Sequence, residues 1–358
     1  MRVLVLGGYG NFGARIVRAL SGDASIDLLV GGRDPARGIA LDHRARNLAE
    51  RLRALGVELL IHAAGPFQHQ ACHVAAAAAA AGAHYIDLAD GRRFVCDFAS
   101  SMDHAFRAAG RSAISGASTV PALSSAVVEH LARGWQRIDM IDLCIAPAQT
   151  APRGTATLEA VLGYCGEKVA VWDEGRWTER RGWARPVRVE FARLAPRLGA
   201  LCDIPDLELF PARYAVTQRV MFRAAQEVAL GQRVFAALAA LRARGWIDNP
   251  ARWARALDRS ARVFDRFGSA LGGMVVRVQG EDADGHAQRR SWHIAADHDH
   301  GPEIPCMAAI LLARRLASGE SLPIGAMPCM GLLALDDFAP EFARWQMATD
   351  LIGEEVGA

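Results

Sequence analysis

The sequence predicts an α/β protein: a Rossmann-type, doubly wound parallel sheet followed by a second, mixed α+β domain. Residues 2–20 read as a short apolar run, three spaced glycines and a stretch with helical spacing, and a second apolar run covers 26–30. Together they make a βαβ unit of about 30 residues. Apolar runs and helical stretches go on alternating to about residue 136, and this alternation is typical of a parallel sheet.

The first predicted strand leads directly into the glycines Gly7, Gly10 and Gly13. The first glycine allows a sharp turn, the second lets backbone approach a pyrophosphate, and the third lets the helix pack close to the strand. The N-terminus of the helix offers unpaired N–H groups and a partial positive charge. The turn therefore predicts a bound dinucleotide; the alternative is an ordinary βαβ turn with packing glycines.

The end of the second predicted strand carries Gly31, Gly32 and then Arg33. An acid usually stands at this place in NAD-binding folds, where it holds the ribose 2′-hydroxyl. A guanidinium would instead pair with a 2′-phosphate. We therefore expect NADP(H) rather than NAD(H), with pairing of Arg33 to its neighbour Asp34 as the alternative.

The other strands of this domain are expected at 57–61, 84–88 and 112–116, with helices at 70–81, 94–109 and 122–133. The strand at 84–88 contains Tyr85 and ends in acids, of which Asp87 lies at the ligand edge. Hydride transfer needs positioning and a group that manages one proton. Asp87 is therefore our first candidate catalytic residue and Tyr85 the second. The alternatives are a loop brace for Asp87 and core packing for Tyr85.

The pattern changes near residue 137, and we predict three segments: a dinucleotide-binding domain at 1–136, a substrate and dimerisation domain at 137–300, and a return to the first domain at 301–358. For the second and third segments we expect a strand at 138–146, a hairpin at 172–177, helices over 216–258, a hairpin of 272–279 with 287–295, a helix at 305–317 and a strand at 325–335.

Composition restricts the partners of this 358-residue chain. A net charge of +2 provides no strong field, so neither nucleic acid nor a membrane is expected. The alanine run 75–81 is too short to cross a bilayer. The first apolar run starts at residue 2, and the seven cysteines show no paired C-x-x-C spacing. Together these observations favour reduced thiols and a cytoplasmic protein.

Four stretches together resemble the saccharopine dehydrogenase-like (saccharopine reductase) NADP-binding oxidoreductase family. They are 7–13, the pair Gly32-Arg33, the AAGPF of 63–67 and the GAHYIDL of 82–88, and GAMP at 325–328 looks like that family's return to the first domain. The resemblance is good over 1–125 and looser in the middle domain. It implies hydride transfer between NADP(H) and an amino- or imino-bearing carbon, or a related carbonyl, of a small molecule. It also implies a homodimer.

The resemblance implies roles for the residues that match these stretches. Those expected to hold the pyrophosphate are Gly7, Gly10, Asn11, Phe12 and Gly13. Arg33 would meet the 2′-phosphate. Ala64, Gly65 and Pro66 would lie along the nicotinamide half.

Arg153 and His298 are the candidates on the substrate side. Arg153 could bind a carboxylate through both guanidinium nitrogens, although a helix-capping loop is the alternative. His298 lies where the second segment meets the third. His69 and His73 have metal-like i, i+4 spacing but lack a third ligand, so no metal is expected.

Two other functions stay open. Tyr164 and Lys168 fit the Y-x-x-x-K pair of short-chain dehydrogenases, and Lys168 is the single lysine of the chain. That pair requires one continuous helix, whereas Gly166 interrupts here. The third possibility is a non-catalytic NADP-binding sensor, which would keep the glycine turn without turning over a substrate.

Overall fold

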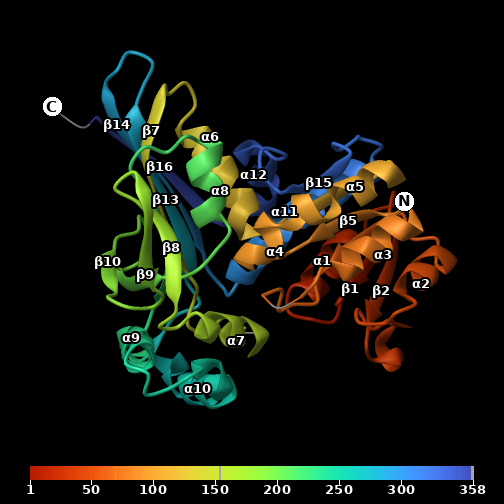
Figure 1. Cartoon of the computed structure of the whole chain (residues 1–358), viewed down its shortest axis with the longest axis horizontal. Coiled ribbons are helices and arrows are strands. Elements are labelled where there is room, and N and C mark those ends of the chain that lie inside the picture. The colour runs from red at the N-terminus through yellow and green to blue at the C-terminus, as the bar shows by residue number, and fades with distance from the viewer. Residues whose placement is uncertain (69, 153–154, 356–358) are drawn as a thin grey trace. The chain divides into compact units, whose positions relative to one another are not determined.

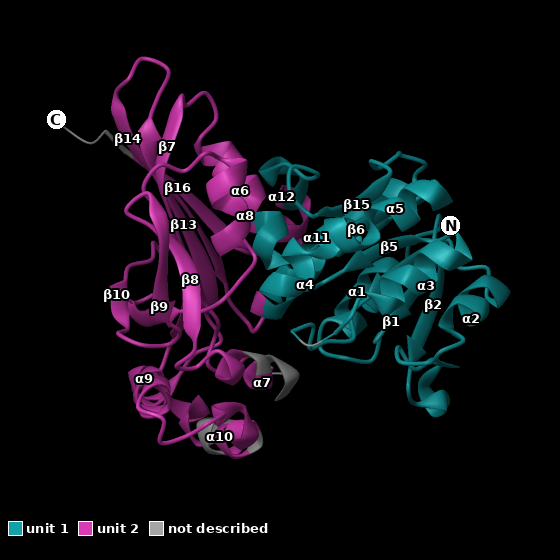
Figure 2. Cartoon of the chain, in the orientation of Figure 1, with its two compact units in different colours: residues 1–123, 302–338 teal, residues 124–301, 339–358 magenta. Residues whose placement is uncertain are grey.

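The computed structural model describes residues 1–68, 70–152 and 155–355. The chain forms two compact units (Figure 1). Unit 1 contains residues 1–123 and 302–338, and unit 2 contains 124–301 and 339–358 (Figure 2). Neither unit is one continuous segment.

Unit 1 is built on a seven-stranded parallel sheet with the order β15-β6-β5-β4-β1-β2-β3. The strands are β1 (Arg2–Leu6), β2 (Asp27–Gly32), β3 (Ile39–Ala40), β4 (Leu59–His62), β5 (His84–Asp87), β6 (Ser112–Ser115) and β15 (Gly325–Pro328). The strand order reverses beside β1, whose neighbours are β2 and β4. Ligands of such sheets bind outside the carboxyl ends of the strands at this reversal. The predicted Rossmann-type sheet is confirmed.

The helices of unit 1 are α1 (Gly13–Leu20), α2 (Leu48–Ala54), α3 (His73–Ala81), α4 (Arg92–Cys96), α5 (Phe98–Ala109) and α11 (Ile304–Ala317), with short helices η1 (Pro35–Arg37) and η2 (Thr119–Leu123). The alanine run forms α3, which ends at Gly82 with φ +75°, a left-handed conformation that glycine adopts without strain. In α11, the Cys306 thiol lies 3.5 Å from the carbonyl oxygen of Phe12, which precedes α1.

Unit 2 is built on a mixed sheet with the order β10-β11-β12-β7-β13-β14-β16. These strands are β7 (Arg137–Ala146), β10 (Val187–Val189), β11 (Arg197–Leu201), β12 (Arg219–Gln226), β13 (Gly272–Glu281), β14 (Ala287–Ala296) and β16 (Ala348–Glu355); β8 (Lys168–Asp173) and β9 (Arg176–Arg181) form a hairpin beside β12. Its helices are α6 (Ser124–Leu131), α7 (Thr155–Gly163), α8 (Asp206–Arg213), α9 (Ala229–Ala243) and α10 (Ala254–Ala261), with η3 (Pro250–Trp253) and η4 (Arg262–Phe267). The short helix η5 (Gly301–Glu303) begins in unit 2 and ends in unit 1. Helix α12 (Leu335–Arg344) begins in unit 1 and ends in unit 2.

Both predicted hairpins are confirmed. Trp172 of β8 lies opposite Trp177 of β9, and their rings meet edge to face with 5.5 Å between centroids. Strands β13 and β14 pair antiparallel along their full length, from Gly272 to Glu281.

The expected helical stretch over 216–258 is wrong at its start. Residues 219–226 form strand β12, parallel to β7, and the helices α9 and α10 follow it. Val220, Met221 and Phe222 are all buried, which is the pattern of a strand covered on both faces. Periodicity alone does not separate such a short apolar run from a buried helix.

The end of the chain also differs from the expectation. The late strand β15 stops at Pro328 rather than running to 335. Residues 339–358 lie in unit 2, where β16 pairs with β14, so the segment 301–358 does not return to the first unit as a whole.

The two faces of the second sheet are covered differently. Trp292 and Ile294 of β14 are buried on the face against which α6 packs. On the opposite face, the segment after β10 packs Phe191 and Leu194 against a small apolar cluster that includes Val275. Ser291 and His293 point to this second face, because side chains alternate along a strand.

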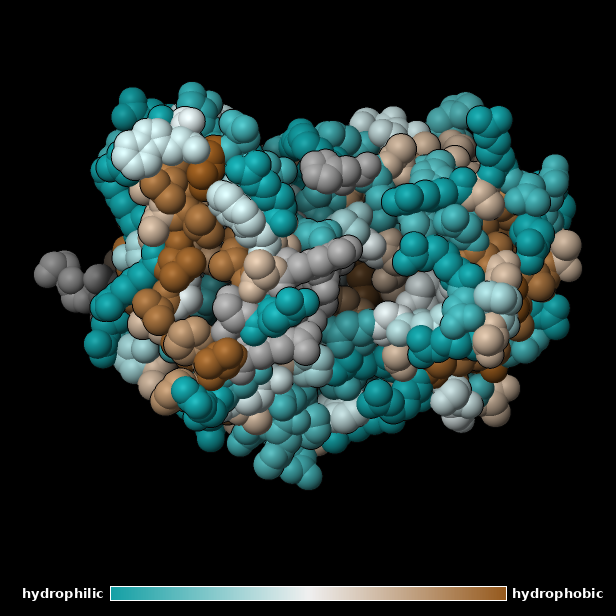
Figure 3. All heavy atoms as spheres, turned by 90° about the horizontal axis from the view of Figure 1, so that it is seen from below, coloured by the Kyte–Doolittle hydropathy of each residue, from teal (hydrophilic) through white to brown (hydrophobic). Residues whose placement is uncertain are grey.

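Apolar side chains also reach the surface of unit 2. Leu230 and Val234 of α9, Trp246 and Phe267 are exposed. A hydrophobic patch lies on the left of the face in Figure 3, among hydrophilic residues. Among the described helices, none combines the length and hydropathy required to span a bilayer.

Candidate functional site

The turn between β1 and α1 has the geometry that the glycines predict. Gly7 has φ +86°, and its carbonyl oxygen accepts a hydrogen bond from the Gly10 N–H at 2.9 Å. Helix α1 begins at Gly13. The N–H groups of the turn and of the first helical residues therefore gather at the carboxyl end of β1.

Side chains would not fit in this turn. A Cβ atom on Gly13 would lie 2.2 Å from the Gly7 carbonyl oxygen, and a Cβ atom on Gly7 would lie 2.8 Å from the backbone nitrogen of Ala64. Both neighbours are backbone atoms that a side-chain rotation cannot move. The turn is thus a bare backbone cradle, which is the kind of surface that lets backbone N–H groups approach a pyrophosphate.

The same turn contacts a second predicted segment. The Ala63 N–H donates to the Leu6 carbonyl oxygen at 2.8 Å, so residues 63–66 leave β4 directly beside the glycines. The Gln70 side-chain amide then holds the loop, because it donates to the carbonyl oxygens of Ala64 (2.7 Å) and Pro66 (2.9 Å). Gly65 and Pro66 are exposed. The structure therefore brings Gly7, Gly13 and Ala64 together at one edge of the sheet.

Arg33 follows the last residue of β2 and is exposed. It makes no hydrogen bond or ion pair with any residue that the structure describes. The alternative partner, Asp34, instead accepts a hydrogen bond from the Ala36 N–H at 3.0 Å and caps η1. A second arginine, Arg37, lies over the Tyr9 ring at 4.7 Å from its centroid. Arg37 was not singled out from the sequence. The proline at position 35 indicates a turn after β2, and this turn brings Arg37 back to Tyr9.

Asp87 ends β5 and has no exposed surface. Its Oδ1 accepts hydrogen bonds from the Ala89 N–H (2.9 Å), the Gly116 N–H (2.8 Å) and the Ser115 hydroxyl (3.0 Å). Burial raises the pKa of Asp87 to about 6, although these hydrogen bonds act in the opposite direction. Asp87 therefore ties together the carboxyl ends of β5 and β6, and it titrates near neutral pH.

Tyr85 and His62 form a buried polar pair on the same face as Asp87. Tyr85 has no exposed surface, and its hydroxyl lies 3.1 Å from Nδ1 of His62 at the end of β4. Burial, and then the charge of Asp87, raise the pKa of Tyr85 well above its usual range. Burial also lowers the pKa of His62 to about 3, so this imidazole is neutral at physiological pH. The Tyr85 ring stacks on Phe98, which fixes its position.

Of the two substrate-side candidates, the structure describes His298 alone. Arg153 lies outside the described residues, and so does His69. His298 belongs to unit 2, where it is exposed after β14 with φ +54°. Its ring faces His300, with 6.1 Å between centroids.

The Tyr164 and Lys168 pair lacks the helix that a short-chain dehydrogenase requires. Helix α7 ends at Gly163, and Lys168 begins β8. The Lys168 ammonium is exposed and pairs with Glu179 at 2.6 Å. This geometry argues against the short-chain alternative.

One group of residues has the composition of a cation site. Asp282, Asp284 and His286 lie in the turn between β13 and β14, with one potential ligand atom of each within 4.8 Å of the others. Oδ1 of Asp282 already accepts hydrogen bonds from the N–H groups of Asp284 (3.0 Å) and His286 (2.9 Å). These hydrogen bonds give Asp282 a structural role, because they hold the turn between β13 and β14.

The parallel sheet with its glycine cradle, joined to a mixed second sheet, defines a two-domain dehydrogenase fold. No protein-family model and no curated protein sequence matches the chain. Among solved structures, apo saccharopine dehydrogenase (L-Glu forming) from Saccharomyces cerevisiae is similar over 99% of both chains, with a TM-score of 0.69 and 12% identity. Homospermidine synthase from Legionella pneumophila, in complex with NAD, is similar over 99% of this chain and 91% of that chain, with a TM-score of 0.62 and 11% identity. More particularly, then, the fold is saccharopine dehydrogenase-like, as the sequence resemblance implied.

Proposed function

We propose that this protein is an oxidoreductase that transfers a hydride between NADP(H) and an amino- or imino-bearing carbon, or a related carbonyl, of a small molecule. The observation that carries the proposal is the glycine cradle at the carboxyl end of β1, where a Cβ on Gly13 would meet the Gly7 oxygen at 2.2 Å. The cradle lies in a saccharopine dehydrogenase-like fold, and two of the solved proteins similar to this chain are named for reactions of amino compounds.

Different residues of the chain bind different parts of the dinucleotide. The backbone of the turn at 7–13 binds the pyrophosphate, with Asn11 and Phe12 between the glycines. Gly7 and Gly10 shape the turn, because their N–H groups already donate to the carbonyl oxygens of Gly31 and Gly7. Ala64, Gly65 and Pro66 line the nicotinamide half. When bound, the nicotinamide supplies or accepts the hydride.

Arg33 selects the phosphorylated cofactor in this proposal. Arg33 is exposed, has no partner among the described residues and directly follows the last residue of β2. Fluorescence titration tests this: we expect NADPH to bind more tightly than NADH. Arg33→Gln should weaken NADPH binding about 10- to 100-fold and leave NADH unchanged, because one charge-assisted pair is lost.

The matched control for this titration is Arg107→Gln. Arg107 is an exposed arginine of unit 1, 63% accessible in its side chain, that pairs with Asp103 on α5. The substitution Arg107→Gln removes one positive charge from unit 1, as Arg33→Gln does. An equal loss of NADPH affinity in both variants would mean that Arg33 acts only through the net charge of the unit and does not contact the 2′-phosphate.

We propose that the predicted catalytic residues Asp87 and Tyr85 act as positioning residues, since neither has exposed surface. Asp87 fixes the loops that begin at Ala89 and Gly116, and its pKa of about 6 lets it exchange a proton near neutral pH. Asp87→Asn should therefore alter the pH profile of turnover more than the KM for substrate. A uniform loss of activity at every pH would indicate a purely structural role.

Substrate choice is tested directly. Saccharopine and homospermidine, offered separately with NADP⁺, are the first compounds to examine, with NADPH absorbance as the readout. Arg153 and His298 are our proposed substrate-binding residues, and their alanine variants should raise KM at similar kcat. The proposal fails if the purified protein binds neither NADPH nor NADH.

We further propose that the protein is a homodimer of the cytoplasm. None of the seven cysteines, all of which the structure describes, forms a disulfide, and this supports a reducing compartment. Analytical ultracentrifugation of the full chain measures the oligomeric state.

A non-catalytic NADP-binding sensor is the second candidate, because Asp87 and Tyr85 are both fully buried. In this case NADPH binds stoichiometrically, yet no member of a panel of imines, ketones and enoyl compounds oxidises it.

A further inference from the structure

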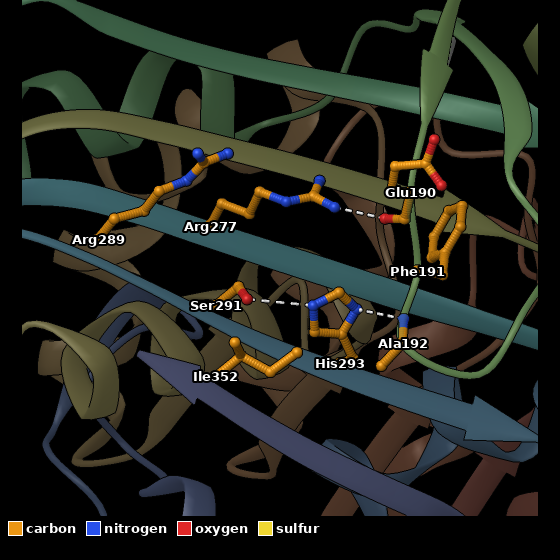
Figure 4. Close-up of a pocket in the computed structure, with 8 residues that line it drawn as sticks. All are labelled: Glu190, Phe191, Ala192, Arg277, Arg289, Ser291, His293 and Ile352. Atoms are coloured by element: carbon orange, nitrogen blue, oxygen red, sulfur yellow. Dashed lines mark hydrogen bonds between the residues drawn. The ribbon is translucent and has the colours of Figure 1, made fainter. Parts of the chain in front are cut away.

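A pocket of about 230 Å³ lies on the second face of the unit 2 sheet, between the segment after β10 and strands β13, β14 and β16 (Figure 4). Its polar lining comes from Glu190, Arg277, Arg289, Ser291 and His293, and Phe191 and Ile352 add apolar surface. All of these residues belong to unit 2 and none belongs to the glycine cradle.

The hydrogen bonds of His293 fix which of its nitrogens carries the proton. The Ala192 N–H lies 3.1 Å from Nδ1, and a backbone N–H can only donate, so Nδ1 is an acceptor. Burial, and then the charge of Arg277, lower the pKa of His293 to about 4, so the ring is neutral at pH 7. Its single proton therefore resides on Nε2, which lies 3.1 Å from the Ser291 hydroxyl.

This arrangement turns Ser291 into a donor toward the pocket. Since Nε2–H donates to the Ser291 oxygen, the hydroxyl hydrogen needs another acceptor. No acceptor for it occurs among the residues that the structure describes. Ser291 is paired across the ladder with Arg277, so the free hydroxyl hydrogen and the guanidinium lie on neighbouring strands of the same face.

Arg277 provides a half-buried positive charge, and Asp142, which lies opposite it in the ladder, is already paired with Arg219 and Arg223. Its Nη2 donates to the Glu190 carbonyl oxygen, and it forms no ion pair within the described part of the chain. Arg289 likewise has no such pair, and Figure 4 draws both guanidinium groups directed the same way. Burial first, and then the neighbouring charge of Arg289, lower the pKa of Arg277. By contrast, nearby Arg193 forms a two-point pair with Asp350 at 2.7 and 2.9 Å.

Two guanidinium groups that form no ion pair among the described residues, together with one hydroxyl, are the donor set that binds a carboxylate or a phosphate. The apolar surface of Phe191 and Ile352 suits a short hydrocarbon part beside that head group. Because a water molecule occupies about 30 Å³ of liquid, the pocket has room for a ligand of roughly ten non-hydrogen atoms or fewer.

We propose that this pocket binds a small organic anion whose carboxylate or phosphate oxygens accept hydrogen bonds from Arg277, Arg289 and Ser291. This site lies outside the dinucleotide proposal and does not depend on it.

Calorimetric titration of the full-length protein with butyrate and, separately, with inorganic phosphate tests the site. We expect saturable binding of at least one anion at one site per chain. Arg277→Gln and Ser291→Ala should each weaken it about tenfold or more, since each removes a donor to a charged oxygen. Ser291→Ala removes one hydroxyl and keeps the strand, so a loss of binding in this variant is not explained by misfolding.

Arg188→Gln is the matched control. Arg188 is an exposed arginine beside the pocket that pairs with Glu190 at 2.7 Å and does not line the cavity. Its variant should bind the anion within twofold of the wild type. No saturable binding of either probe, or an equal loss in Arg188→Gln, would overturn the proposal. Conversion of a dimer to monomer by butyrate would also overturn it, because the pocket would then hold a side chain of a second copy.

Discussion

The Ser115 hydroxyl donates a 3.0 Å hydrogen bond to Oδ1 of Asp87, and this contact joins the carboxyl ends of β5 and β6. The same oxygen receives the N–H groups of Ala89 and Gly116. One carboxylate oxygen therefore fixes two loops at the edge of the sheet where a dinucleotide is expected.

Replacement of Asp87 should separate its acceptor role from its charge. Asp87→Ala leaves two buried N–H groups without an acceptor, so we expect a loss of about 2–4 kcal/mol in the free energy of unfolding. Asp87→Asn keeps Oδ1 and should cost much less. Urea denaturation at pH 7 measures both variants, and an alanine variant as stable as the wild type would contradict the brace.

Gly13→Ala should abolish NADPH binding, because the new Cβ would lie 2.2 Å from the Gly7 oxygen and would displace the backbone of the cradle. Gly22→Ala is the matched control. It lies just after α1, and a Cβ there has nothing within 4 Å. Fluorescence titration of NADPH should distinguish the two alanines; unchanged binding in Gly13→Ala would mean that the turn does not hold the cofactor.

Asp206 should make the stability of unit 2 fall as the pH rises. The carboxyl has no exposed surface, accepts a 2.5 Å hydrogen bond from Ser124, and has a pKa that burial raises to about 7. The folded pKa lies above the unfolded value of 3.8, so the folded state favours the protonated form. Its contribution is complete below about pH 4 and is lost as the pH rises through 7.

Asp206→Asn cannot titrate at this position and keeps the hydrogen bond to Ser124. Between pH 5 and 8, the wild type should lose on the order of 2 kcal/mol of stability relative to this variant. Urea denaturation across that range gives both curves. Parallel curves would show that Asp206 is not the titrating group.

Lys168→Ala should leave both stability and NADPH oxidation nearly unchanged. Its ion pair with Glu179 is exposed on both sides, at 64% and 60%, and such pairs contribute less than about 1 kcal/mol. The lysine is also not on a helix with Tyr164. If Lys168→Ala folds normally but no longer turns over substrate, the short-chain dehydrogenase mechanism would be supported instead.

The sequence predicted the first unit well, because glycine spacing and apolar runs are local signals. The turn at 7–13 and the helix that ends at Gly82 follow from such signals. The sequence could not separate the buried strand β12 from a helix, since Val220, Met221 and Phe222 are apolar on both faces. Nor could it identify β16, whose partner β14 lies about fifty residues earlier in the chain.

The candidate site divides in the same way. Gly7, Gly10, Gly13 and Arg33 were predicted from a motif and a charge. The contact of His62 with Tyr85 was missed because it joins neighbouring strands that are 23 residues apart in sequence. The anion pocket was missed for a similar reason, since its lining depends on the register of β13 against β14.

The interleaving of the two units restricts the order in which the chain can fold during synthesis. Strand β15 (Gly325–Pro328) pairs with β6 (Ser112–Ser115), so a ribosome must make more than two hundred further residues before the first sheet is complete. The second sheet is completed later still, because its strand β16 contains almost the last described residues. A nascent chain therefore carries an open sheet edge for most of its translation, and a premature stop codon near the end would damage the second unit while leaving every strand of the first.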